Sequence, residues 1–275
     1  MKIELDIALA KAYYRPRQAD SHKGTYGHGL LVAGSRGMMG AAVISAKACL
    51  RSGIGLLTTF LPEPERMILQ QSVPEAMLAF ELPRKKKIRQ YAAVAIGPGI
   101  GTEKKSKEIL ERIISASPQR LLLDADALNI LSANKKILAL LPKQTIITPH
   151  TKEFDRIFGE HKTDKQRIRT AKVAAKKWQI IIVLKNATTI ITDGKHSIYN
   201  NRPNPGLAKG GSGDMLTGII LSFLAQGYEP LDSAILAVYI HSTAAAKCLT
   251  SQSEESMLAT DVIEYIGAAF DSINK

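Results

Sequence analysis

One glycine-rich segment, residues 204–214 (Asn-Pro-Gly-Leu-Ala-Lys-Gly-Gly-Ser-Gly-Asp), constrains this chain more than any other. It leads directly into an apolar segment, residues 215–225, whose composition suits a helix. Glycines permit positive φ and a close approach, so their backbone N–H groups can converge on one anion at a helix N-terminus. The segment therefore predicts a phosphate-binding loop. Taken alone, it also fits a glycine-rich turn with an ordinary aspartate cap.

Asp214 closes this loop and falls in the first turn of the expected helix. A carboxylate is favoured there by the helix dipole, and it would lie beside a bound phosphoryl group. Such a carboxylate can take the proton of a hydroxyl that attacks phosphorus. Asp214 is therefore predicted to be a general base next to an anion hole.

Several expected strands end in glycine or polar residues. Residues 92–96 lead into a second glycine turn that ends at Gly101, residues 120–123 lead into Asp124-Ala-Asp126, and residues 145–148 lead into Pro149 and His150. Ligands bind at the carboxyl edge of an open parallel sheet, so these turns together predict one shared crevice. Each residue by itself also fits a capping or structural role.

Residues 185–189 (Lys-Asn-Ala-Thr-Thr) lie between two β-rich segments. They offer a positive charge and hydroxyl donors to a phosphate or a ribose, although a polar hairpin turn is the simpler alternative. Residues 190–192 and 195–199 predict antiparallel strands that are joined by a turn at Asp193 and Gly194.

Hydrophobic periodicity and breaker residues predict the other elements. Further strands are expected at 29–34, 55–61 and 180–184, and helices at 41–52, 103–115, 127–131, 164–178, 215–225, 231–249 and 259–270. Residues 1–28 are a polar lead-in that either covers a site or forms a simple loop. The order of elements predicts a three-layer α/β/α sandwich with a mainly parallel central sheet and a few antiparallel strands near residues 188–199. We expect residues 1–275 to form a single domain.

Composition limits the classes of partner and the cellular location that we expect for this protein. No segment reaches the roughly 18 uninterrupted apolar residues of a membrane span, and the first residues lack an apolar signal core, so a cytoplasmic protein without a membrane partner is expected. Cys49 and Cys248 are predicted to be buried free thiols. The net charge of +12 is spread over short basic runs without interleaved aromatic residues. This pattern predicts a solvated basic face that steers anionic substrates, and no nucleic-acid partner.

Five blocks of the sequence together resemble the ADP- or ATP-dependent NAD(P)H-hydrate dehydratases, which belong to the ribokinase-like superfamily. They occur in the family order at residues 97–101, 123–128, 148–153, 185–189 and 204–214. The resemblance covers the chain from about Gly29 onward and is to a stand-alone dehydratase. It implies an enzyme that dehydrates the S form of hydrated NADH or NADPH and consumes ADP or ATP. The ring hydroxyl would be phosphorylated, and phosphate would then be eliminated.

The resemblance also implies roles for particular residues. Asp214 would be the catalytic base, and the N–H groups of Gly211, Ser212 and Gly213 would form the anion hole. The AMP part of the nucleotide would contact Lys185, Asn186, Ala187, Thr188, Thr189 and Gly213. The hydrated dinucleotide would lie against Ala41 or Ala42, Gly101, His150 and Asp214. Asp124, Asp126, Asn129 and Glu153 would form a polar floor near Mg²⁺, which would bridge the nucleotide phosphates.

Two positions depart from the family pattern. Lys152 stands where a glycine is expected before Glu153, which leaves the placement of Glu153 open. Asn186 also replaces an expected glycine, and asparagine tolerates the left-handed backbone conformation better than most residues do.

Two other functions remain open from the sequence. The first is a ribokinase-like kinase that phosphorylates a thiazole or pyrimidine alcohol and releases the ester intact. The second is a catalytically silent protein that binds nucleotides or nucleic acid. The family resemblance further implies a homo-oligomer, with a tetramer as the leading form, and functional pairing with a separate NAD(P)H-hydrate epimerase.

Overall fold

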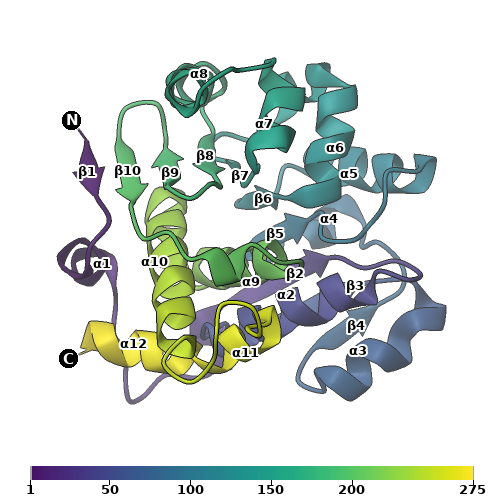
Figure 1. Cartoon of the computed structure of the whole chain (residues 1–275). Coiled ribbons are helices and arrows are strands. Elements are labelled where there is room, and N and C mark those ends of the chain that lie inside the picture. The colour runs from purple at the N-terminus through teal and green to yellow at the C-terminus, as the bar shows by residue number, and fades with distance from the viewer. Residues whose placement is uncertain (1, 275) are drawn as a thin grey trace.

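Short runs of valine, isoleucine and leucine form the central sheet. The computed structural model describes residues 2–274, and within them one ten-stranded sheet has the order β1-β10-β9-β8-β7-β6-β5-β2-β3-β4 (Figure 1). Neighbouring strands are parallel except that β9 runs antiparallel to both β8 and β10. The strands are β1 Ile3–Glu4, β2 His28–Val32, β3 Leu56–Phe60, β4 Met77–Ala79, β5 Ala93–Ile96, β6 Leu121–Leu123, β7 Ile146–Ile147, β8 Ile181–Leu184, β9 Thr189–Thr192 and β10 Ser197–Asn200.

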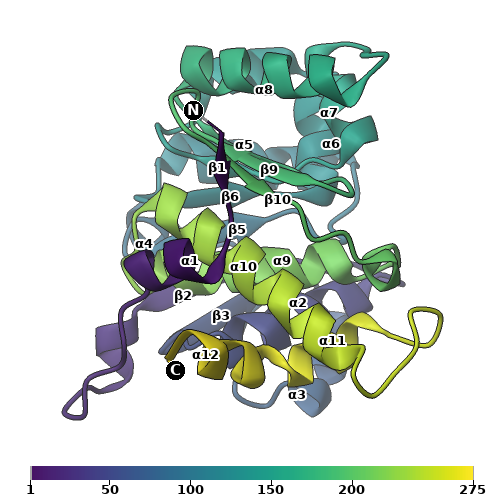
Figure 2. The ribbon, with the colours of Figure 1, turned by 60° about the vertical axis from the view of Figure 1, so that its left-hand side comes forward.

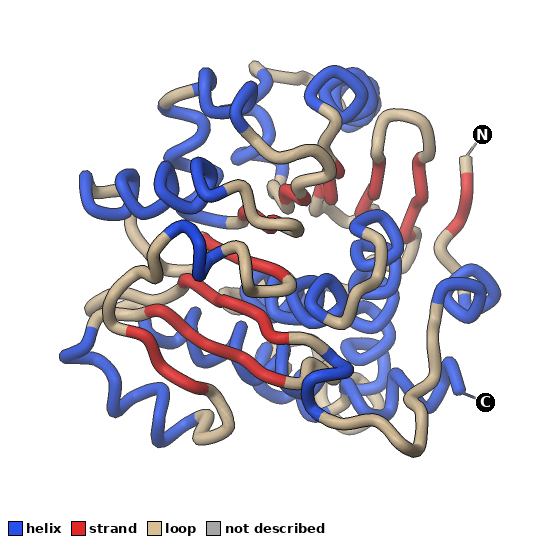
Figure 3. The backbone as a smooth tube through the Cα atoms, turned by 180° about the vertical axis from the view of Figure 1, so that it is seen from behind, coloured by secondary structure: helices blue, strands red, loops and turns tan. Residues whose placement is uncertain are grey.

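Helices cover both faces of this sheet (Figures 2 and 3). The first layer contains α1 Ile7–Tyr13, α2 Met39–Arg51, α3 Arg66–Ser72, α9 Ser212–Ala225, α10 Pro230–Cys248, α11 Ala259–Glu264 and α12 Ile266–Asn274. The second contains α4 Lys85–Ile88, α5 Lys104–Ala116, α6 Ala125–Ala133, α7 Thr151–Phe158 and α8 Asp164–Trp178. The predicted three-layer α/β/α architecture is therefore confirmed.

The inner strands β5, β6, β7 and β8 are apolar throughout because both faces of the sheet are buried there. In β2, Leu31 packs into the core beneath the first helix layer and Leu30 into the core beneath the second. In β8, Val183 and Ile182 divide in the same way. The side chains of the inner strands alternate between two cores, so their sequences show no alternation of polar and apolar residues.

One expected helix, residues 259–270, is instead two helices. The expectation of a single helix was wrong because the backbone leaves the helical region at Tyr265, where φ is −90° and ψ is 2°. The change of direction lets α11 bury Val262 and Ile263 while α12 separately buries Ile266 and Ala269. Tertiary packing thus overrides a continuous local preference for helix.

Several short elements had no expected counterpart, among them β1, β4, α1, α3 and α7. Residues 2–28 are not a simple loop, because they contain β1, α1 and a short 3₁₀ helix at Lys23–Tyr26. The strand β1 pairs with β10 at one edge of the sheet. None of these elements is long enough to show a clear hydrophobic periodicity in the sequence.

Two glycines permit close backbone contacts that position the carboxyl edge of the sheet. Gly97 has a φ of 142°, and a Cβ on it would lie 1.8 Å from the backbone oxygen of Asp124. In α9, a Cβ on Gly218 would lie 2.2 Å from the backbone oxygen of Ser45 in α2. No side chain fits at either place, so β5 sits directly against the residue that follows β6, and α9 directly against α2.

The two cysteines are buried and form no disulfide, as predicted. Among the helices that the structure describes, none is long and apolar enough to cross a membrane.

Candidate active site

A cavity of about 730 Å³ opens where the strands end at their carboxyl edge. Its wall combines the residues that follow β6, β7 and β8 with the glycine-rich segment and one side of α10. The lining residues are Asp124, Ala125, His150, Thr151, Glu153, Lys185, Asn186, Ala187, Thr189, Asn200, Arg202, Pro203, Asn204, Pro205, Leu207, Ala208, Lys209, Gly210, Ser212, Gly213, Asp214, Leu216, Val238, His241 and Ser242. Four of the five sequence blocks, all except residues 97–101, thus meet in one cavity wall.

A buried ion pair lies at the centre of this wall. Lys185 Nζ donates to Asp124 Oδ1 at 2.9 Å, and the hydroxyl of Thr217 donates to Asp124 Oδ2 at 2.7 Å. Asp124 is only 1% exposed, so both of its oxygens are satisfied inside the protein. Burial alone would lower the pKa of Lys185, but the carboxylates of Asp124 and Glu153 outweigh burial and raise it. Lys185 therefore stays charged at neutral pH.

The first turn of α9 faces this ion pair. Gly211 precedes the helix with a φ of 93°, which turns the chain into α9. A Cβ on Gly213 would lie 3.1 Å from Lys185 Nζ, so a larger residue there would press on the end of the lysine. N–H groups in the first turn of a helix have no acceptor within the helix. The start of α9 and Lys185 therefore offer an anion both backbone donors and a positive charge.

Asp214 lies in the same first turn. Burial, followed by the negative charge of Asp124, raises the pKa of Asp214 to about 6, although Lys185 opposes the shift. The hydroxyl of Ser45 donates to the backbone oxygen of Asp214 at 3.0 Å and fixes this turn to α2. A carboxylate with a pKa near neutrality is suited to accept and return a proton at physiological pH.

The glycine-rich segment is held by its own side chains. Asn204 Oδ1 accepts the N–H of Gly206 at 3.0 Å, and Lys209 Nζ donates to the backbone oxygen of Met257 at 3.0 Å and to that of Glu255. Lys209 thus ties the loop to the segment before α11. Lysine in a phosphate loop often binds the anion, but here Lys185 is the lysine that sits next to the helix start.

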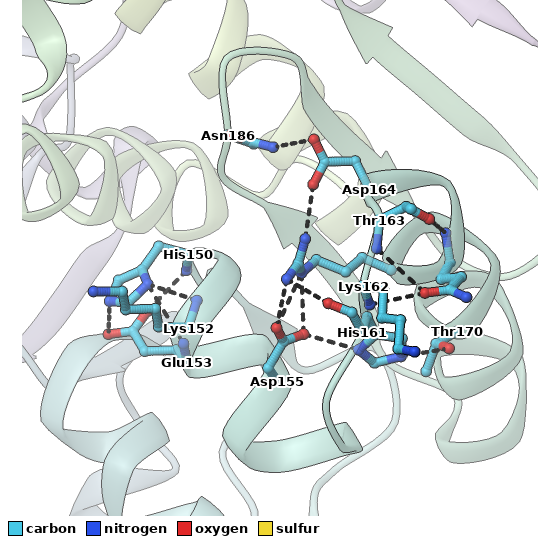
Figure 4. Close-up of polar contacts among 12 residues, drawn as sticks. His150, Lys152, Glu153, Asp155, His161, Lys162, Thr163, Asp164, Thr170 and Asn186 are labelled. Carbon is cyan, nitrogen blue, oxygen red and sulfur yellow. Dashed lines mark hydrogen bonds and ion pairs between the residues drawn. The ribbon is translucent and has the colours of Figure 1, made fainter.

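His150 and Glu153 form a capping box at the start of α7 (Figure 4). His150 Nδ1 accepts the N–H of Lys152 at 3.1 Å, and Glu153 Oε2 accepts the N–H of His150 at 2.8 Å. Because Nδ1 is an acceptor, the neutral ring carries its proton on Nε2. Both side chains also line the cavity. His150 and Glu153 therefore both cap α7 and line the cavity. The lysine at position 152 does not prevent Glu153 from taking this position.

The segment after β8 is anchored to α8 (Figure 4). Asn186 Nδ2 donates to Asp164 Oδ2 at 2.8 Å, and Arg167 joins Asp164 to Asp155 in α7. Asn186 does not have a positive φ, so the backbone does not require glycine at this position. Of the predicted nucleotide contacts, Thr188 alone is absent from the cavity wall.

The predicted contacts of the second substrate are divided, because His150 and Asp214 line the cavity and Gly101 does not. The N–H of Gly101 donates to Asp126 Oδ2 at 2.9 Å, and Asn129 bridges Asp126 and Arg156. None of these residues lines the cavity itself, and neither does Ala41. Ala42 is buried in the core and Ala41 is half-buried, and the predicted contact of either residue with the hydrated dinucleotide stays a prediction.

The sequence did not point to His241 or Thr217, because both lie within apolar helices. His241 Nε2 lies 3.1 Å from the backbone oxygen of Ser212 and 3.3 Å from its hydroxyl. A carbonyl only accepts, so Nε2 carries the proton. Burial, assisted by Lys185, lowers the pKa of His241 to about 4, and the ring is neutral at physiological pH. It holds the first residue of α9 in place.

Among residues 2–274, no group of three or more histidine, cysteine, aspartate or glutamate side chains could hold a metal ion. Mg²⁺ in nucleotide sites usually needs only one or two carboxylates, because phosphates and water supply the other ligands. Both oxygens of Asp124 are already bonded, which leaves Asp214 as the carboxylate next to the anion position. This donor set fits an ion carried by a nucleotide, not one held by the protein alone.

The chain is similar to proteins of one family. A family profile described as NAD(P)H-hydrate dehydratase matches residues 29–268. The bifunctional NAD(P)H-hydrate repair enzyme of Vibrio cholerae is 33% identical over 96% of the chain. The chain covers 53% of that relative, so it spans about half the length of the first curated relatives it matches. The ADP-dependent (S)-NAD(P)H-hydrate dehydratase of Streptococcus thermophilus is 35% identical, with 88% of this chain and 90% of that protein covered.

Solved structures of related proteins are similar to this chain over nearly its whole length. A ribokinase-like superfamily protein from Enterococcus faecalis has a TM-score of 0.88 at 27% identity and covers 98% of this chain and 96% of its own. The ADP/ATP-dependent NAD(P)H-hydrate dehydratase from Bacillus subtilis, crystallised with ATP and Mg²⁺, has a TM-score of 0.87 at 31% identity, with 98% of each chain covered.

Proposed function

The chain belongs to the NAD(P)H-hydrate dehydratase family, and we propose that it dehydrates the S form of hydrated NADH or NADPH at the expense of ADP or ATP. The dehydratases of S. thermophilus and B. subtilis, which match nearly all of this chain, support the proposal. The product would be the ordinary reduced cofactor, which makes the protein a metabolite-repair lyase.

One observation carries this proposal. Asp214, with a pKa of about 6, lies in the first turn of α9, whose Gly213 is next to Lys185. The turn therefore places a proton acceptor and an anion site side by side. A phosphoryl group held there would face a substrate hydroxyl that hydrogen-bonds to Asp214.

The proposed reaction has two steps. First, the ring hydroxyl attacks the terminal phosphorus of the nucleotide, its proton passes to Asp214, and the bond from phosphorus to the bridging oxygen breaks. The N–H groups of the α9 first turn and Lys185 stabilise the charge on the phosphoryl oxygens. Second, the carbon–oxygen bond breaks and phosphate leaves, while a neighbouring ring carbon passes a proton to water and the ring double bond returns. Phosphorylation is needed because hydroxide is a poor leaving group.

Mg²⁺, when present, would supply positive charge that neutralises the nucleotide phosphates. Asp214 is the carboxylate of the cavity that would face the ion. The B. subtilis relative, which was crystallised with ATP and Mg²⁺, supports a part for the ion in the proposed reaction. Glu153, Asn129 and Asp126 would contribute to the Mg²⁺ site only indirectly, because their side chains already form hydrogen bonds within the protein.

We propose that residues 1–275 act as a single dehydratase domain, because one continuous sheet includes both the strand at residues 3–4 and the strands of the site. A homo-oligomer is supported by exposed apolar side chains around β4, such as Met67, Met77 and Phe80, whereas the tetramer rests on the family resemblance alone. Pairing with a separate epimerase is supported by the bifunctional relatives, which are about twice as long.

The test is to incubate purified protein with Mg²⁺, S-form NADH-hydrate and either ADP or ATP. Absorbance in the reduced-nicotinamide band and released phosphate are followed together. Recovery of reduced cofactor in step with phosphate would establish the reaction and identify the phosphoryl donor. A stable phosphorylated product from an alcohol substrate, without recovery of cofactor, would instead assign the chain as a small-molecule kinase.

A further inference from the structure

Part of the cavity wall has no role in the reaction proposed above. It is formed by Asn200 at the end of β10 and by Val238 and Ser242 on α10. Thr189, at the start of β9, is directly opposite Asn200 in the antiparallel ladder. Opposite residues in such a ladder project their side chains from the same face of the sheet. Asn200 and Thr189 therefore share the face that α10 covers.

Asn200 is 6% exposed, yet its side-chain oxygen has no hydrogen-bond partner. Buried polar atoms are almost always paired. Of the unpaired buried side-chain atoms within residues 2–274, Oδ1 of Asn200 is the one that belongs to a residue of this cavity wall. An orphaned acceptor at a cavity wall indicates a ligand that supplies the missing donor.

The amide can turn to meet such a ligand. Rotation about the last torsion of an asparagine is soft, and no hydrogen bond holds the oxygen where it is. The two amide atoms are also distinguished only by their hydrogen bonds. The amide therefore presents one acceptor and one donor to the cavity.

The surroundings of the amide select the kind of ligand. Val238 on α10 and Leu207 and Ala187 on the loops give the cavity apolar surface. The nearby hydroxyl of Ser242 already donates to the backbone oxygen of Tyr239 at 3.1 Å. Apolar surface in the cavity together with an amide whose oxygen is unpaired suits a flat heteroaromatic ring that carries a donor next to an acceptor along one edge.

We propose that Asn200 determines the nucleobase of the phosphoryl donor by pairing with adenine. Its oxygen accepts a hydrogen bond from the 6-amino group, and its nitrogen donates one to the ring nitrogen N7. This inference rests on the proposed function, since it assumes that the nucleotide occupies this cavity. A 6-oxo purine presents only acceptors, O6 and N7, along this edge, so the Asn200 oxygen stays unpaired even if the amide turns.

The test compares ADP with inosine diphosphate, which carries oxygen in place of the 6-amino group. Dissociation constants are measured by calorimetry with Mg²⁺ for the unmodified protein and for Asn200→Ala. We expect the unmodified protein to bind ADP about 10- to 100-fold more tightly, the range of one amide–base pair. Asn200→Ala should weaken ADP binding and bring the two constants to within about threefold. Ser242→Ala is the matched control, and its ADP preference should match that of the unmodified protein.

Equal binding of the two nucleotides by the unmodified protein would overturn the proposal without recourse to any variant. Asn200→Ala with its ADP preference intact would also overturn it, as would a loss of affinity for NADH-hydrate in place of ADP. These measurements need no turnover. Selective ADP binding that depends on Asn200, in a protein without dehydratase activity, would keep this inference and reject only the proposed reaction.

Discussion

Two cavities of similar volume lie at opposite edges of the same sheet. The one at the carboxyl edge measures about 730 Å³ and the one at the amino edge about 680 Å³. The second is formed by the segments that precede β7 and β8, the turn between β9 and β10, and the start of α10. Its charged residues include Lys143, Lys176, Lys195 and Asp193. Volume therefore does not distinguish the two.

The charges do distinguish them. At the amino edge the three lysines are exposed, and burial of Asp193 is outweighed by hydrogen bonds from His196 and Lys195, which lower its pKa. At the carboxyl edge Asp214 has a pKa of about 6 because it is buried beside Asp124. A carboxylate that accepts several hydrogen bonds has a lowered pKa and stays ionised at neutral pH. A carboxylate whose pKa is raised by burial and a neighbouring negative charge can exchange a proton near neutral pH. Chemistry is therefore expected only at the carboxyl edge.

The strongest test of this difference replaces one aspartate in each cavity. Asp214→Asn should lower kcat by about two to four orders of magnitude, the usual range for a lost general base, while ADP binding changes little. Asp193→Asn should leave kcat unchanged. Steady-state kinetics and calorimetry measure the two effects. Comparable kcat values for Asp214→Asn and the unmodified protein would remove Asp214 from the mechanism.

A second test compares buried with exposed charge. Asp124→Asn removes the partner of Lys185 and leaves a buried charge unpaired, so the free energy of unfolding should fall by about 3–5 kcal/mol. Lys176→Ala in the amino-edge cavity should change it by less than about 0.5 kcal/mol, because that lysine is exposed. Urea denaturation gives both values. Equal stability of the two variants would show that the Asp124 pair is not a structural element.

The pH dependence of activity follows from the pKa of Asp214. A general base works as the carboxylate, so kcat/KM should fall about tenfold per pH unit below pH 6. The pKa of Asp193 lies below its ordinary value, so that residue makes no contribution in this range. A pH series of initial rates tests this. Activity that rises as the pH falls through 6 would mean that the protonated form of Asp214 is the active one.

The smallest expected effect concerns stability. The folded-state pKa of Asp214 is about 6, above the ordinary value of 3.8, so ionised Asp214 destabilises the fold as the pH rises through this interval. At pH 8, Asp214→Asn should therefore gain on the order of 2 kcal/mol, and the gain should vanish below about pH 4. Asp193 has a lowered pKa and should behave oppositely, so that Asp193→Asn loses stability at neutral pH. Denaturation curves at both pH values give the free energy of unfolding of each variant. A loss of stability in Asp214→Asn at pH 8, or a gain in Asp193→Asn at neutral pH, would contradict the prediction.

Much of the fold was predictable because its signals are local. The run at 164–178 was expected as a helix, and the structure has α8 at Asp164–Trp178, where Thr163 and Gln166 form a capping box. The turn at Asp193 and Gly194 joins β9 to β10, as expected. The break at Tyr265 was not predictable, because it depends on how α11 and α12 pack against other helices.

The site was predictable only where its residues end strands or form the glycine loop. Asp124, His150 and Lys185 each follow an apolar strand, and topology brings them to one edge. Thr217, His241 and Asn200 could not be found in this way. The first two lie inside helices that are otherwise apolar, and the third ends a strand whose ladder partner is known only from the register.

The contact between α2 and α9 bears on the order in which the molecule assembles. Ser45 and Asp214 are 169 residues apart in the chain, yet a hydrogen bond joins them and Gly218 brings the two backbones together. Contacts between such distant segments form slowly, because a long loop must close first. Nucleotide binding during refolding should therefore lag behind the recovery of helical signal, so the ligand reports on completed folding and not on collapse.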